Sequence, residues 1–209
     1  MKPILFNTEM VRAILEGRKT VTRRPIKPQP AGELRRMGAD SCYPGCFAEN
    51  GEDRVYRPPY MAGDVLYVRE TFRVDYLSNI IGSGRVEYKD GTYMDISFGA
   101  ERYDMMQRAQ RKSGWRPNEN MPREAARIFL RVTTVRAERL RDMVLGDVLM
   151  EGGKEADTYE ETWNRWHQTW DSTIPKHPNK FKRYPYYWDD NPWVWVIEFE
   201  RISKEEAAT

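Results

Sequence analysis

Residues 193–199, Trp-Val-Trp-Val-Ile-Glu-Phe, are the feature that most constrains the fold, because their β-branched and aromatic content predicts a buried strand. The preceding Asn191-Pro192 pair supplies a turn. Segment 65–72 has the same composition and follows a Gly63-Asp64 turn. In segment 126–136 arginines alternate with apolar residues, which predicts a strand with one buried face and one solvent-exposed face. With a short strand at 2–6, these segments predict a sheet.

Three helices are expected between these strands. The first runs to Leu15 from a cap at Asn7 or Thr8. An amphipathic helix over 140–149 should stop at Glu151-Gly152-Gly153, where glycine can adopt the left-handed conformation. A capping box at 158–161 opens the third, whose apolar stripe consists of Trp163, Trp166 and Trp170. Strands and helices do not alternate regularly, so we expect the α+β class.

Two long segments interrupt this pattern. Residues 29–59 begin among prolines and contain both cysteines, Cys42 and Cys46. Residues 73–120 include an Asp90-Gly91 hairpin signal and a weakly periodic helix over 101–112. A chain of 209 residues that is 40% hydrophobic can build one sizeable core. We therefore expect one domain over 1–203 with insertions at about 29–59 and 73–120, and a C-terminal tail over 204–209.

Composition excludes several function classes. The formal charge of +2 gives no global attraction to polyanions, so contacts with nucleic acid must be local. The absence of a long apolar run or a signal peptide predicts a cytoplasmic protein without membrane contact. Two cysteines and two histidines provide few candidate ligands for a zinc site, so we expect neither a metal nor a cofactor. The sequence indicates no oligomeric state.

The segment Gly17-Arg18-Lys19-Thr20-Val21-Thr22-Arg23-Arg24 concentrates one lysine, two hydroxyls and three guanidinium groups. If the segment is extended, Thr20, Thr22 and Arg24 share a face. Lys19 joins that face only if the chain turns at Gly17. An exposed basic turn would have the same composition. Glu70 and Arg69 end a predicted strand, where a charged pair forms either a surface salt bridge or part of a cleft.

Several pieces together resemble the ASCH-domain family of the PUA-like superfamily, in particular its phage and prophage members. The matching pieces, in chain order, are Ile14–Arg24, Gly63–Glu70, Met121-Pro122 with Ala126–Ile128, Val135–Leu140, Glu151-Gly152 and Asn191–Val196. They span nearly the whole chain outside 29–59 and 73–120. The resemblance implies a small PUA-like β-barrel flanked by helices.

Bacterial N4-acetylcytidine amidohydrolases of this family use a lysine and a threonine from the G-R-K-T-x-T motif and a glutamate further on. The resemblance therefore implies Lys19 and Thr22 as catalytic residues, with Glu151 as the glutamate and Glu155 as the alternative. We expect the Glu151 carboxylate within hydrogen-bond or single-water reach of the Lys19 amine, at about 2.6 to 3.2 Å if the contact is direct. The remaining expected substrate contacts are Arg18, Thr20, Arg23, Arg24 and Glu70. The substrate would be a small acylated cytosine nucleoside.

Two other functions remain open. PUA-like barrels resemble RNA binders, and residues 176–188 interleave basic and aromatic side chains that suit a phosphate backbone and stacked bases. A Pro-rich aromatic loop packed on the domain fits the same residues. Relatives in the ASCH family also include a metal-assisted ribonuclease, for which this chain offers few ligands.

Overall fold

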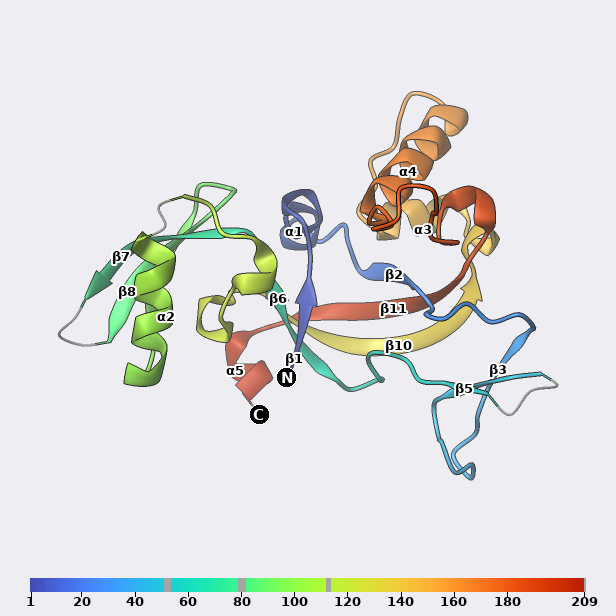
Figure 1. Ribbon diagram of the computed structural model, residues 1–209, viewed down its shortest axis with the longest axis horizontal. Helices are drawn as coiled ribbons and strands as arrows, with labels where there is room; N and C mark the ends of the chain where they lie inside the picture. Colours follow the sequence, from blue (N-terminus) through green and yellow to red (C-terminus); the bar gives the residue numbers. More distant parts are fainter. Residues whose placement is uncertain (51–53, 79–81, 112–113, 209) are drawn as a thin grey trace. The chain divides into compact units, whose positions relative to one another are not determined.

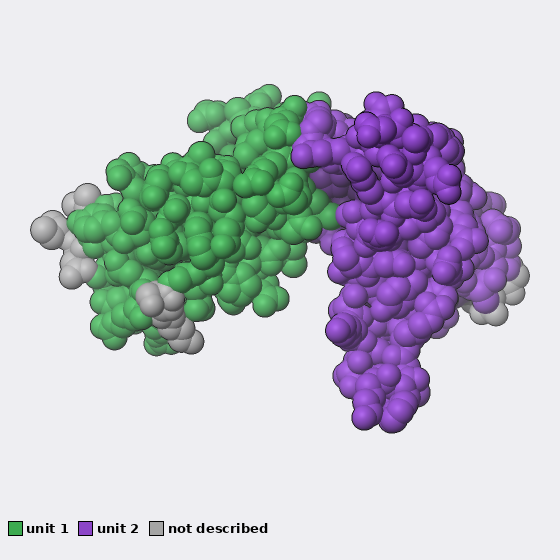
Figure 2. Space-filling model, turned by 90° about the horizontal axis from the view of Figure 1, so that it is seen from above, with its two compact units in different colours: residues 1–16, 64–131, 200–209 green, residues 17–63, 132–199 purple. Residues whose placement is uncertain are grey.

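The computed structural model describes residues 1–50, 54–78, 82–111 and 114–208, which form two compact units (Figure 2). Unit 1 comprises Met1–Glu16, Asp64–Arg131 and Glu200–Thr209, and unit 2 comprises Gly17–Gly63 and Val132–Phe199. Lys112, the predicted end of a helix, and Thr209, the end of the predicted tail, lie outside the described residues. Strands and helices are mixed, which confirms the α+β class.

The strands form three sheets with the orders β1-β6-β10-β11-β2, β3-β4-β5 and β7-β8-β9. Their bounds are β1 Lys2–Leu5, β2 Val21–Pro25, β3 Leu34–Arg36, β4 Phe47–Glu49, β5 Val55–Tyr56, β6 Val65–Arg69, β7 Phe72–Ser78, β8 Ser83–Tyr88, β9 Tyr93–Ser97, β10 Phe129–Arg139 and β11 Trp193–Ile202. Within the described ranges these sheets are open, and the strands close no barrel.

The helices are short except for two (Figure 1). Their bounds are α1 Thr8–Leu15, α2 Ala100–Arg111, α3 Leu145–Met150, α4 Tyr159–Thr173 and α5 Lys204–Ala208, with 3-10 turns at Asn118–Asn120, Arg123–Ala125, Leu140–Asp142 and Trp188–Asp190. The expected tail thus contains the short helix α5. No helix of the described part of the chain has the length and apolarity needed to cross a bilayer.

Unit 1 contains β1 paired in parallel with β6, and the start of β10 paired antiparallel with β6. Asn7 caps α1 by accepting from the Met10 amide at 2.9 Å, as expected for one of the two candidate caps. The predicted strand over 65–72 is interrupted, because β6 ends at Arg69 and β7 begins at Phe72. The Asp90-Gly91 hairpin is confirmed, with Gly91 at φ +83° between β8 and β9.

The β7–β9 sheet of unit 1 has a separate apolar core against α2 and the turns that follow it. Phe72, Val86, Tyr88 and Met106 are fully buried there. This core gives the segment 73–120 its own folding interactions, so the predicted insertion is a structured subdomain rather than a loop.

Unit 2 is organised around the antiparallel pairing of β2 with β11, in which Thr22 lies opposite Ile197 and Arg24 opposite Trp195. Directly opposite residues share a face, and the face alternates along each strand. Val21, Val194 and Val196 therefore project together toward α3 and α4, where they pack with Trp166 and Trp170. We call this side the helical face, and Figure 1 shows α3 and α4 above it.

The opposite side of this ribbon is covered by the small sheet β3-β4-β5, drawn below β11 in Figure 1. Phe47 of β4 meets the Trp195 ring edge-on at a centroid distance of 5.2 Å. Part of the predicted insertion over 29–59 is thus folded onto the second face of the ribbon, which we call the sheet face.

Two sequence predictions for unit 2 need comment. The expected helix over 140–149 is wrong as a single element, because the chain is extended at Met143 between a 3-10 turn and α3. The Asp147 carboxylate accepts from the Val144 amide at 2.8 Å and starts a new helix there. The tryptophan stripe is confirmed as core, since Trp166 and Trp170 are buried and Trp163 packs at their edge.

Candidate functional site

The Gly17–Arg24 segment leaves α1 through a left-handed turn and becomes β2. Gly17 has φ +74°, a conformation that favours glycine. The main chain then pairs briefly with the end of α3, since Lys19 and Glu151 form an antiparallel bridge and the Thr20 amide donates to the Met150 carbonyl at 2.9 Å. The backbone itself therefore brings position 19 to position 151.

The Lys19 amine donates to three acceptors. They are the Glu151 carboxylate at 2.7 Å, the Val21 carbonyl at 2.7 Å and the Glu151 carbonyl at 2.9 Å. The side chains are 0% and 3% exposed, so the pair is covered. The predicted distance between Lys19 and Glu151 is confirmed. Glu155, the alternative, is exposed.

Arg23 adds a second cation to the same carboxylate. Its guanidinium lies 3.4 Å from Glu151, 2.7 Å from Glu138 and 3.2 Å from Asp147, and its side chain is 0% exposed. Arg136 donates to the other oxygen of Glu138 at 3.0 Å. A buried charge is stable only when it is paired and hydrogen-bonded, and here each cation meets at least one carboxylate.

The charge state of Lys19 is set by two opposing effects. Burial lowers the pKa of the Lys19 amine below its ordinary value of 10.5, whereas the Glu151 carboxylate raises it and the nearby Arg24 and Arg23 lower it. Desolvation is the largest of these effects, so deprotonating the Lys19 amine costs less free energy than deprotonating an exposed lysine. A lysine of this kind can exchange a proton with its partner.

Thr22 is buried, at 3% exposure, on the sheet face of β2. The three acceptors given above for the Lys19 amine are the Glu151 carboxylate and two main-chain carbonyls, and the Thr22 hydroxyl is not one of these three. The Val21 carbonyl that accepts from Lys19 nevertheless belongs to the peptide bond that leads into Thr22. The Lys19 amine thus contacts the main chain directly before Thr22, the predicted nucleophile.

The other predicted contacts are divided between the units. Arg18 donates to the Gly152 carbonyl at 2.8 Å, Arg24 is half-buried beside Thr22 on the sheet face, and Thr20 is exposed. Glu70 lies in unit 1, where both its oxygens accept from Arg127 at 2.8 Å. It does not pair with its neighbour Arg69, which donates instead to the Glu119 carbonyl.

A pocket of about 470 Å³ adjoins the turn that carries Glu151. Its lining consists of Arg18, Leu149, Met150, Gly153, Lys154 and Glu155. Such a volume is within the usual range for small-molecule sites, about 300 to 1,000 Å³. Gly152, at φ +88°, turns the chain between the buried carboxylate and this pocket.

The basic aromatic segment 176–188 is mostly packed against unit 2. Tyr186 is buried in the core of the helical face, and Tyr184 and Trp188 pack at its edge. Arg183 is held by Asp190 at 2.6 Å. Phe181 is different, because it is 87% exposed.

Sequence reasoning missed the acidic partners of Arg23, namely Glu138 and Asp147. The alternation of Arg136 and Glu138 along β10 is a signal for a charged face on this strand. In the described ranges, no group of three His, Cys, Asp or Glu side chains is placed to hold a metal ion.

Comparison of the chain with protein-family models, with curated proteins and with solved structures finds no match in any of the three.

Proposed function

We propose that this protein is a cofactor-independent amidohydrolase that cleaves the N4-acyl amide of N4-acetylcytidine or of related acylated cytosine nucleosides. The observation that carries the proposal is the buried 2.7 Å contact between Lys19 and Glu151, two residues that the family resemblance implies as catalytic.

Amide hydrolysis needs a nucleophile, a base that takes its proton and an acid that protonates the leaving amine. In the proposed reaction the Thr22 oxygen attacks the acyl carbon while its proton passes to the neutral Lys19 amine. The tetrahedral intermediate then breaks its carbon–nitrogen bond as Glu151, protonated in the pair that shares one proton with Lys19, gives that proton to N4. Water hydrolyses the threonyl ester and releases the carboxylic acid.

This chemistry requires the Lys19 amine to approach the Thr22 hydroxyl when the substrate binds. Catalytic hydrogen bonds are often long in unliganded enzymes and shorten in the substrate complex. The lowered pKa of Lys19 supports its role as the base, because a neutral amine is needed to accept a proton. The initial rate should fall at high pH, where the pair loses the shared proton that Glu151 gives to the leaving amine.

We further infer that unit 2 is related to the ASCH fold of the PUA-like superfamily. The support is the order of the motif pieces along the chain and the pairing of β2 with β11, which brings the first and the last of these pieces together.

The test is to incubate pure protein with N4-acetylcytidine and follow the absorbance change as the amide is cleaved. Glu151→Gln should lower turnover about 10²-fold or more, since general acid catalysis contributes about that factor. The matched control is Glu160→Gln, an exposed glutamate on α4 that lines neither pocket, which should retain turnover. No turnover at micromolar wild-type protein, or equal loss in both variants, would refute the proposal.

RNA binding without catalysis is a second candidate, favoured by the exposed Phe181 between Lys180 and Lys182. An exposed aromatic ring flanked by cations can stack on a base. Titration with single-stranded RNA at low salt should then show binding that weakens with salt and in Phe181→Ser. RNA cleavage that stops in EDTA would instead indicate the metal-assisted ribonuclease.

A further inference from the structure

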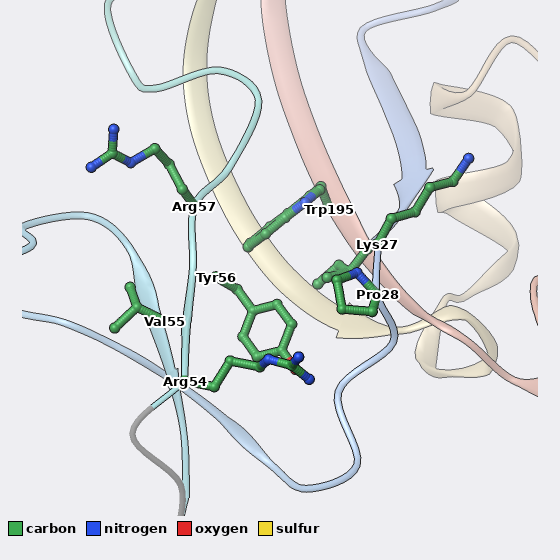
Figure 3. A pocket seen from close by; sticks show the side chains of 8 residues that line it. Lys27, Pro28, Arg54, Val55, Tyr56, Arg57 and Trp195 are labelled. Atoms are coloured by element: carbon green, nitrogen blue, oxygen red, sulfur yellow. The ribbon is translucent and has the colours of Figure 1, made fainter.

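Unit 2 contains a second pocket, of about 130 Å³, on the sheet face of the β2–β11 ribbon (Figure 3). Its lining consists of Ile26, Lys27, Pro28, Arg54, Val55, Tyr56, Arg57 and Trp195. At about 30 Å³ per water molecule, the space corresponds to roughly four waters. The pocket therefore suits one small ring rather than a large ligand.

The walls of this pocket are aromatic and are fixed by other contacts. The Tyr56 hydroxyl donates to the Glu49 carboxylate at 2.9 Å, and that carboxylate also accepts from the Gly32 amide. Trp195 is held from behind by the edge-on ring of Phe47. Protein sites commonly hold a nucleobase by stacking it on such aromatic faces.

The pocket is also surrounded by cations. In Figure 3 the Arg54 side chain runs along the Tyr56 ring, and the side chains of Lys27 and Arg57 extend outward from the rim. The Lys27 amine lies over the Tyr186 ring, 5.1 Å from its centroid, and the Gly32 amide, together with the Arg54 charge, helps to hold the pKa of the Glu49 carboxyl low. Among the residues that the structure describes, Arg57 forms no salt bridge, whereas Arg183 and Arg141 on the same unit are paired with aspartates. The nearby Glu49 is already committed to Tyr56 and Gly32. An anionic group of a ligand would complete this rim.

The strand register places the pocket next to Thr22. Trp195 lies opposite Arg24, two residues along β2 from Thr22, and all three project to the sheet face. Two residues of a strand span about 7 Å. A ligand whose amide lies at Thr22 can therefore extend its remaining part toward Tyr56 and Trp195.

We infer that this pocket and its cationic rim bind the ring and the phosphate of a phosphorylated pyrimidine nucleoside. This inference rests on the proposed function and specifies its substrate class, a nucleotide or a nucleotide unit of RNA in place of a free nucleoside. The ring lies between Tyr56 and Trp195, and the phosphate oxygens accept from Arg54 and Arg57. Planar guanidinium groups match phosphate geometry particularly well.

Calorimetric titrations test the inference without any acylated compound. The ligands are cytidine, cytidine 5′-monophosphate, inorganic phosphate and a cytidine trinucleotide. The monophosphate should bind at least about tenfold more tightly than cytidine, since charge-assisted hydrogen bonds typically contribute a factor of that size. Inorganic phosphate should bind more weakly than the monophosphate, because it lacks the ring. A trinucleotide that binds more tightly than the monophosphate identifies RNA as the source of the phosphate, and equal or weaker binding identifies a free nucleotide.

Arg54→Gln and Arg57→Gln should each remove most of the preference for the monophosphate. Both side chains are exposed, so the variants should fold, and their unfolding midpoints verify this. The charge-matched control is Arg165→Gln on α4, which covers the helical face, and it should retain the preference. Equal binding of cytidine and its monophosphate, phosphate alone binding as well as the nucleotide, or variants that behave like Arg165→Gln would overturn the inference. Amide hydrolysis is measured separately, so nucleotide binding without hydrolysis would refute only the proposed function.

Discussion

Replacing both members of the Lys19–Glu151 pair should be much less harmful to stability than replacing one. Glu151→Leu leaves the buried Lys19 ammonium with main-chain carbonyls at 2.7 and 2.9 Å but without a carboxylate. Lys19→Met leaves the Glu151 carboxylate with Arg23, 3.4 Å away. The double variant Lys19→Met/Glu151→Leu leaves neither charge unpaired and has side chains of similar volume.

The expected magnitudes follow from the burial of the pair, whose side chains are 0% and 3% exposed. Removing one partner of a buried pair typically costs about 3 to 5 kcal/mol. We expect Glu151→Leu in this range and Lys19→Met near its lower end, because Arg23 continues to neutralise the carboxylate. Apolar replacement of a whole buried pair is often neutral, so the double variant should recover most of the loss. The coupling energy should exceed about 1.5 kcal/mol.

Urea unfolding followed by tryptophan fluorescence suits this cycle. Of the seven tryptophans of the chain, all but Trp115 lie in unit 2, so the signal reports mainly on the unit that holds the pair. The matched control is the Arg141–Asp189 pair of the same unit, 3.2 Å apart with side chains 45% and 90% exposed, whose coupling should stay below about 1 kcal/mol. If the free-energy changes of Lys19→Met and Glu151→Leu simply add in the double variant, the pair has no special energetic role and the reasoning fails.

Three further outcomes are expected. The Gly32 amide and the Tyr56 hydroxyl hold the pKa of Glu49 below its usual 4.5. The stability that the ionised Glu49 carboxylate contributes is therefore present above pH 4.5 and is lost as pH falls through the lowered pKa. Denaturation midpoints measured across this range should depend less on pH in Glu49→Gln than in the wild-type protein. In unit 1, Arg127→Met should destabilise the protein by about 3 kcal/mol at pH 7, because Glu70 is left buried without its bidentate partner, and adding Glu70→Gln should restore part of this in the same denaturation assay. Phe181→Ser should change the free energy of unfolding by less than about 0.5 kcal/mol in urea titrations, since this side chain is 87% exposed.

The contact between Lys19 and Glu151 could be predicted from the sequence because the family resemblance names both positions. Gly17 turns the chain two residues before Lys19, and two glycines follow Glu151, so both backbones can bend into a close approach. The glycines after Glu151 favoured it over Glu155 as the glutamate, and the exposed position of Glu155 agrees with that choice. The roles of these residues in a reaction stay predictions, as does the single domain over 1–203.

Other features depend on interactions that the sequence does not display. The partner of Arg23, Glu138, is 115 positions away, and only the register of the strands decides which carboxylates meet it. The break between the 3-10 turn at 140–142 and α3 was missed because hydrophobic periodicity continues across it, whereas the Asp147 cap on Val144 begins a separate helix. By strand alternation Phe129 shares a face with Arg127 and Arg131, yet it is 5% exposed because it packs with Tyr67, Ala126 and the C-terminal helix residue Ala207.

The bridge between positions 19 and 151 is made by main-chain atoms as well as by side chains. The two positions would therefore stay opposite each other whatever residues occupy them, as long as the glycine turns on either side are kept. The two positions therefore form a pair of fixed backbone geometry whose side chains can be replaced by design. A histidine and aspartate, or two cysteines, placed at these two positions would start from an existing close approach and would need no rebuilding of the surrounding strands.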